Sequence, residues 1–124
     1  MRILLSIKPE YVYKILDGTK KFEYRRTVFK NKNVDSMVIY ATLPEGLVVA
    51  EVEVLGVLSG SKTEIWQRTK KYSGISRRDL FAYFKGKKEA HAIQLGKVTP
   101  YIEPKTLKDF DASLKAAPQS FIYL

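Results

Sequence analysis

The apolar segments of this chain are short, and most of the connections between them have no room for a crossover helix. Strand-like patterns cover residues 3–7, 21–25, 36–42, 47–58, 90–95, 98–102 and 121–124; helix-like patterns cover 9–17, 63–72 and 76–84, and a short turn or helix covers 107–110. Parallel neighbours need a crossover of a dozen or more residues, whereas antiparallel neighbours need only a turn. The order therefore predicts an α+β fold, in which a mixed, largely antiparallel sheet curls toward a β-barrel with short flanking helices.

The first predicted helix has both of its ends marked in the sequence. Pro9 suits the first turn, where a missing N–H leaves no hydrogen bond unmade. Val12, Ile15 and Leu16 follow at the spacing of one helical face. Gly18 favours a left-handed terminating residue, so the chain turns at once toward the strand predicted for 21–25.

Composition excludes several kinds of chemistry. The chain has no cysteine and one histidine, which leaves no thiolate nucleophile, no disulfide and few ligands for zinc or iron. No Gly-rich phosphate-binding motif is present, and no apolar run approaches the ~20 residues that span a bilayer. We expect a single domain over residues 1–124, cytoplasmic, with no membrane association, no metal and no cofactor.

The net charge of +9 is unevenly distributed along the chain. Residues 1–33 contain nine Lys or Arg and three acids, and residues 61–88 contain nine and two. Residues 34–60 contain four acids and no Lys or Arg, and the last 36 residues are balanced. If the two basic blocks meet on one face, that face attracts polyanions such as RNA, with Arg77 and Arg78 as candidates for phosphate contacts. The alternative is a generally solvated basic surface.

The segment from Gly18 to Arg25 places several charges beside a turn that opens a strand. Strand periodicity puts Lys21, Glu23 and Arg25 on one face, with Lys20 at the turn. A carboxylate between cations holds them in place for an anionic or carbonyl group of a ligand. The alternative is a solvated edge strand whose charges prevent aggregation.

Four of these residues, Gly18, Lys20, Glu23 and Arg25, match the pattern Gly-x-Lys-x-x-Glu-x-Arg. With the opening Leu-Leu-Ser-Ile-Lys-Pro at residues 4–9 and Ala-Pro-Gln-Ser-Phe at 117–121, the chain resembles the ASCH domain family of the PUA-like superfamily. The resemblance runs from the first strand to the last. It implies a PUA-like pseudo-barrel with a cleft beside the motif, which binds RNA or a nucleotide-like ligand in the control of transcription or translation.

Some members of that family are enzymes, either amidohydrolases of acylated cytidines or ribonucleases. The amidohydrolase group has a lysine at the position of Lys20, a threonine nucleophile where this chain has Glu23, and a downstream glutamate that Glu51 or Glu53 could supply. A carboxylate cannot act as the hydroxyl nucleophile of that scheme. If the chain is an enzyme, its catalytic residues are expected to be Lys20 and Glu23.

Further candidate contacts lie near the ends of other strands. Tyr40 either belongs to the core or stacks on a base from the edge of the cleft. Gln119 and Ser120 could form hydrogen bonds with a base edge. The full set of predicted ligand-binding residues is Lys8, Gly18, Lys20, Lys21, Glu23, Arg25, Arg26, Tyr40, Gln119 and Ser120.

Overall fold

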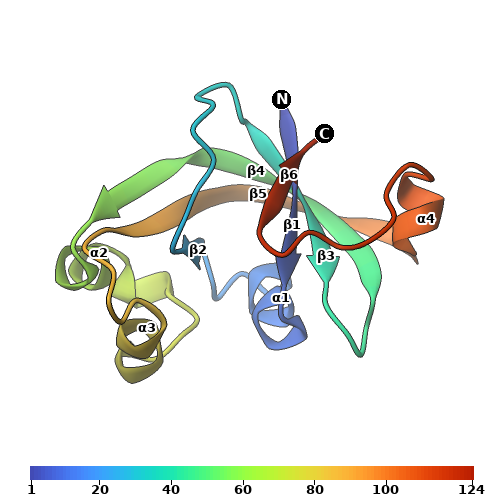
Figure 1. Ribbon diagram of the computed structural model, residues 1–124. Helices are drawn as coiled ribbons and strands as arrows, with labels where there is room; N and C mark the ends of the chain where they lie inside the picture. Colours follow the sequence, from blue (N-terminus) through green and yellow to red (C-terminus); the bar gives the residue numbers. More distant parts are fainter.

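The computed structural model describes all 124 residues and forms one curled sheet with helices packed against it (Figure 1). The elements are β1 (Arg2–Ile7), α1 (Pro9–Leu16), β2 (Phe22–Arg25), β3 (Ser36–Ala41), β4 (Leu47–Gly60), α2 (Lys62–Thr69), the 3-10 turn η1 (Lys70–Tyr72), α3 (Arg77–Tyr83), β5 (Ala90–Lys105), α4 (Leu107–Phe110) and β6 (Phe121–Tyr123). The strand order is β2-β5-β4-β3-β1-β6. Only β1 and β3 pair in parallel, which confirms the predicted mixed, largely antiparallel sheet.

The two longest strands give the sheet its curl. β4 and β5 pair along most of their lengths, with register shifts between Val48 and Ala50, between Val52 and Val54, and between Val54 and Gly56. Such bulges bend a strand and increase its twist. In Figure 1 the two strands arch over α1, α2 and α3, so the sheet forms a half-barrel whose concave side faces these helices. The sequence patterns at 90–95 and 98–102 belong to the single strand β5.

Three apolar clusters hold the helices to the sheet. The largest lies between the sheet and α1, where Val12 and Ile15 pack against strand residues such as Ile39. A second cluster lies under α2 and α3, around Ile65 and Leu80. The third covers the opposite side of β1 and β3 with α4 and the segment after it. The helices α1 and α3, which flank β2 in Figure 1, are therefore attached to the sheet by two different apolar clusters.

The helix predicted over residues 63–72 is shorter than expected. α2 ends at Thr69 and continues as η1. The Thr69 hydroxyl donates to the carbonyl oxygen of Ile65 at 2.6 Å and accepts from the Tyr24 hydroxyl at 2.7 Å. A side chain that bonds back to the preceding turn disfavours continuation of an α-helix. At the other end Ser61 and Glu64 form a capping box.

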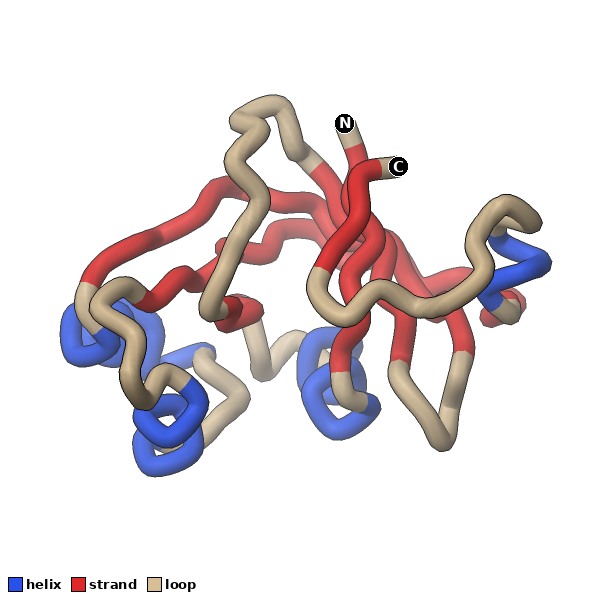
Figure 2. The backbone as a smooth tube through the Cα atoms, viewed as in Figure 1, coloured by secondary structure: helices blue, strands red, loops and turns tan.

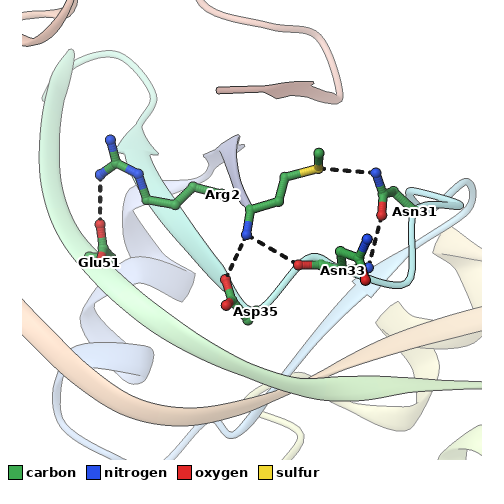
Figure 3. Close-up of polar contacts among 6 residues, drawn as sticks. Arg2, Asn31, Asn33, Asp35 and Glu51 are labelled. Carbon is green, nitrogen blue, oxygen red and sulfur yellow. Dashed lines mark hydrogen bonds and ion pairs between the residues drawn. The ribbon is translucent and has the colours of Figure 1, made fainter.

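The start of β1 is fixed by exposed polar contacts, which we call the amino-end cluster (Figure 3). The Met1 ammonium group pairs with Asp35 at 3.1 Å, and Arg2 pairs with Glu51 at 2.8 Å. The two chain termini lie side by side (Figure 2), because β6 pairs with β1 and the Leu124 amide donates to the Arg2 carbonyl oxygen. No helix has the length and apolar character needed to cross a membrane.

Candidate functional site

A cleft of about 1100 Å³ opens on the concave side of the sheet. Its walls come from the ends of β1 and β3, the start of α1, the whole of β2 after Phe22, one face of α3 and residues 117–120. In Figure 1, β2 lies between α1 and α3 in the view. Segments distant in sequence meet here, which is the usual setting of a ligand site.

Lys20 lies at the bottom of this cleft and is only 3% exposed. Its Nζ donates to the carbonyl oxygen of Ser73 at 2.7 Å and lies over the rings of Tyr24 and Tyr11, 4.7 and 5.1 Å from their centroids. Burial lowers the pKa of Lys20 to about 8, although the nearby Glu23 carboxylate partly offsets this effect. Neutral Lys20 is therefore a minor form at neutral pH and becomes substantial at mildly alkaline pH, where it can accept a proton.

Glu23 is 6% exposed, so the alternative of a solvated edge strand does not describe this residue. The reason is tertiary, since Glu23 lies beside Arg25, which contacts Ser6 and Ser120 from segments distant in the chain. Burial raises the pKa of Glu23, and the neighbouring cations Lys20 and Arg25 oppose the rise. The carboxyl group is thus a proton donor or acceptor within the cleft.

Arg25 connects the motif to the C-terminal segment through long contacts. Its guanidinium lies 3.5 Å from Glu23 Oε2, 3.4 Å from the Ser6 carbonyl oxygen and 3.5 Å from Ser120 Oγ. The Nε–H is buried and has no protein acceptor. Because these contacts are long, and one donor is unused, the guanidinium has hydrogen-bonding capacity left for a ligand. We refer to Lys20, Glu23 and Arg25 as the charged cleft group.

The cleft as a whole is nearly balanced in charge. Its lining contains four cations, Lys8, Lys20, Arg25 and Arg26, and three carboxylates, Glu10, Glu23 and Asp79. The excess positive charge of the chain therefore lies mostly outside the cleft. The cleft itself presents paired charges, hydroxyl groups and aromatic rings.

Four tyrosines line the cleft: Tyr11, Tyr24, Tyr40 and Tyr83. Tyr40 is 9% exposed and belongs both to the third apolar cluster and to the cleft wall, so the two readings of its position are compatible. The ring of Tyr83 is covered by the Arg26 guanidinium, which also donates to the Tyr83 carbonyl oxygen at 2.7 Å. This contact ties the end of β2 to the end of α3.

The segment 117–120 is held against the cleft by β1. The Ser6 hydroxyl donates to the carbonyl oxygen of Pro118 at 2.7 Å. Ser120 lies within reach of Arg25, and Gln119 is exposed at the rim. A ligand in the cleft would therefore contact residues from both ends of the chain.

Most of the ten predicted ligand-binding residues line this cleft: Lys8, Lys20, Glu23, Arg25, Arg26, Tyr40, Gln119 and Ser120. Gly18 and Lys21 do not. Gly18 ends α1 with φ +87°, and its role is to turn the chain. Lys21 precedes β2 and lies over the exposed ring of Tyr72, 4.4 Å from its centroid, so it is directed away from the cleft.

The suggested downstream glutamate is also absent from the cleft. Glu51 pairs with Arg2 in the amino-end cluster, and Glu53 accepts from the Lys97 amide at 3.3 Å. The expectation that either could complete an amidohydrolase site is wrong, because the exposed side of β4 carries both carboxylates at a different part of the sheet.

Sequence reasoning missed several residues of the site. Tyr11, Tyr83 and Asp79 line the cleft, but each reads in sequence as an ordinary helix position. The weak signal for Tyr11 is its place in the turn directly after Lys8-Pro9. Ser73 has no recognisable signal, because its carbonyl oxygen rather than its side chain contacts Lys20.

Comparison with known proteins connects this arrangement to a family. A family model described as ASCH domain matches residues 5–116. The chain is 28% identical to the ASCH domain-containing ribonuclease of Zymomonas mobilis over 123 residues, which cover 98% of this chain and 82% of that protein. The crystal structure of ASCH from Zymomonas mobilis has a TM-score of 0.89 and 28% identity, over 99% of this chain and 87% of that chain. Two variants of that protein, one with tyrosine changed to phenylalanine and one with serine changed to alanine, give TM-scores of 0.89.

A longer protein also contains a similar segment. The chain is 32% identical to the large ribosomal subunit protein uL22 of Ureaplasma parvum serovar 3 over 123 residues. That match covers 98% of this chain and 39% of the relative. The chain thus spans about two fifths of the length of that protein.

Proposed function

The chain belongs to the ASCH domain family, and from that premise we propose that it is an RNA-binding module whose cleft receives one nucleotide-like group of the strand. The observation that carries the proposal is the meeting of the charged cleft group with four tyrosine rings in one cleft. Unpaired bases stack on aromatic side chains, here the half-buried Tyr11 and Tyr83 rather than the buried Tyr24 and Tyr40, and form hydrogen bonds through their exposed edges. Phosphates of the same strand would lie outside, on the basic surface.

The proposed contacts to RNA use side chains of the cleft that have hydrogen-bonding groups available for a ligand. Arg25 has long contacts and one unused donor, so it can donate to a base or phosphate oxygen while it stays beside Glu23. Gln119 at the rim has amide donors and acceptors that suit a base edge. Lys8 is exposed at the mouth, where a backbone phosphate would leave the cleft. A module of this kind suits the control of transcription or translation.

Fluorescence anisotropy with a labelled single-stranded RNA tests the proposal. We expect affinity to fall steeply between about 50 and 200 mM salt, because bound counterions are released when phosphates are neutralised. Arg25→Gln should weaken binding about tenfold, and Lys108→Gln, on the exposed α4 outside the cleft, about twofold at most. Affinity that is flat with salt, or equal losses in the two variants, would contradict the proposal.

A second candidate is a ribonuclease, which the name of the Zymomonas mobilis relative favours. In RNA cleavage the 2′-oxygen attacks the adjacent phosphorus and the bond to the 5′-oxygen breaks. One proton leaves the 2′-hydroxyl and one reaches the departing oxygen. Neutral Lys20 would accept the first proton and protonated Glu23 would supply the second, consistent with the opposite directions of their pKa shifts.

Cleavage of a labelled RNA beside its 2′-deoxy counterpart tests this second candidate. Activity is expected on RNA, none on the deoxy strand at the same position, and none in Lys20→Ala. Activity that survives Lys20→Ala would exclude the assignment of Lys20. RNA binding without any cleavage would support the proposal of a binding module and contradict that of a ribonuclease.

A further inference from the structure

The side chain of Lys20 is held in the cleft by a second segment of the chain, which packs along it. Residues 73–76 connect η1 to α3, and Ser73 and Gly74 of this connection lie against Lys20. Gly74 has φ +63°. A Cβ atom added to Gly74 would lie 2.6 Å from Lys20 Cβ, 2.7 Å from Cγ and 2.8 Å from Cδ. These are the near atoms of the lysine side chain, which cannot move away without moving the whole residue.

The same segment also binds the end of that side chain. The Lys20 Nζ donates to the Ser73 carbonyl oxygen at 2.7 Å. Ser73 is 5% exposed, and its hydroxyl donates to the Ile75 carbonyl oxygen at 2.7 Å, which closes the turn on itself. Gly74 therefore allows the backbone to approach the methylene groups of Lys20 closely. The Ser73 carbonyl oxygen fixes the position of the Lys20 ammonium group.

Neighbouring contacts dock this turn on both sides of Lys20. The Lys21 amide donates to the Tyr72 carbonyl oxygen at 2.9 Å. The Lys14 ammonium group donates to the Gly74 carbonyl oxygen at 3.2 Å. The turn is thus attached to α1, to the start of β2 and to the lysine between them, and its position is coupled to that of the lysine.

We propose that Ser73 and Gly74 are positioning residues, which hold the Lys20 amine in the cleft in one orientation toward the ligand. One N–H of the ammonium group is used by the Ser73 carbonyl oxygen, and the others face the tyrosine rings and the cleft. The proposal adds positioning residues to the RNA-binding function proposed above. It rests on that function only for the identity of the ligand. The positioning itself is measurable in the free protein.

Gly74→Ala is compared with Gly86→Ala as a matched control. The comparison separates the effect on the position of Lys20 from the loss of stability that alanine causes at any positive φ. Gly86 has φ +81°, and a Cβ there would meet no atom within 4 Å. Both variants carry alanine at positive φ, but only the first displaces Lys20. Thermal unfolding of both variants provides the measure of the shared backbone cost.

The decisive readout is the titration of the Lys20 side chain by ¹³C-detected NMR, with Lys20→Arg used to assign its signal. Since burial is what lowers the pKa of Lys20 to about 8, displacement into water should raise it in Gly74→Ala toward the ordinary lysine range. Gly86→Ala should leave it unchanged. RNA affinity should fall several-fold in Gly74→Ala and not in Gly86→Ala. Equal behaviour of the two variants in both readouts would overturn the proposal.

A measurement on the unaltered protein covers the case in which Gly74→Ala fails to fold. The ¹³C shift of the Ser73 carbonyl should titrate with the same midpoint as Lys20, because the hydrogen bond depends on the lysine proton. A Ser73 carbonyl signal that is insensitive to Lys20 titration would overturn the proposal. If the protein binds no RNA while the two midpoints agree, the proposed function fails and the positioning stands.

Discussion

Charged side chains lie near both ends of β1, but in opposite settings. At one end the amino-end cluster is solvated, with side-chain exposures of 47% and 37% for Arg2 and Glu51. At the other end, the side chains of Arg25 and Glu23 are 13% and 8% exposed. In water an ion pair contributes little to stability, whereas buried charges depend strongly on their partners. Charged pairs thus occur at both ends, but only the pair in the cleft is buried. Burial of charged side chains, rather than charge alone, distinguishes the candidate site.

The largest expected effect comes from removing one arginine at each end. Arg25→Met leaves the buried Glu23 without its ion-pair partner, so we expect a loss of about 3 kcal/mol in the free energy of unfolding. Arg2→Met removes an exposed pair and should cost less than about 1 kcal/mol. Urea unfolding measures both. Equal losses would mean that the two ends do not differ energetically.

The pH dependence of stability gives the next effect. Because the folded-state pKa of Lys20 is about 8 and the unfolded value is near the model-peptide value of about 10.5, the unfolded state binds more protons between these pH values. Stability due to Lys20 should therefore rise with pH across that window, by about 2 kcal/mol when its remaining solvent contact is allowed for. The rise should be absent in Lys20→Met and retained in Lys108→Met. Parallel pH profiles for all three proteins would contradict burial of the charge.

A smaller effect is expected from one serine at each end. Ser6→Ala removes the hydrogen bond to the Pro118 carbonyl oxygen and should cost about 1 kcal/mol, with faster amide hydrogen exchange in residues 120–123. Ser36 lies at the amino end of β3 and its hydroxyl has no hydrogen bond within the protein, so Ser36→Ala should change stability by less than about 0.5 kcal/mol. Unchanged exchange in Ser6→Ala would show that segment 117–120 is held by other contacts.

The smallest effect is the salt sensitivity of the two ion pairs. Double-mutant cycles should give a coupling energy of about 0.5 kcal/mol for Arg2 and Glu51 at low salt, falling toward zero near 1 M NaCl. The coupling of Arg25 and Glu23 should change less, because solvent ions reach a buried pair poorly. Similar salt dependence in both cycles would contradict the difference in burial.

The sequence predicted the elements better than it predicted the site. Local signals identified α1 with its Pro9 start and Gly18 end, and the helices within 63–72 and 76–84. These features depend on neighbouring residues in the chain, so periodicity and capping chemistry reveal them.

Burial of the charged cleft group could not be read from periodicity. Alternation predicted that Lys21 and Glu23 share one face, but Glu23 is buried and Lys21 is exposed. What decides is the placement of α1 and α3 against β2, which comes from apolar contacts between distant segments. The motif match with the ASCH family supplied what periodicity lacked, because it singled out Lys20, Glu23 and Arg25 as a group.

The account depends on RNA entering the cleft and not merely adhering to surface lysines. Titration of a ¹⁵N-labelled sample with a single-stranded RNA, followed by amide chemical shifts, tests this directly. The account predicts the largest changes at Glu23, Arg25 and Ser120, and little change at Arg2 and Glu51. Changes spread evenly over the exposed lysines, or concentrated in the amino-end cluster, would contradict it.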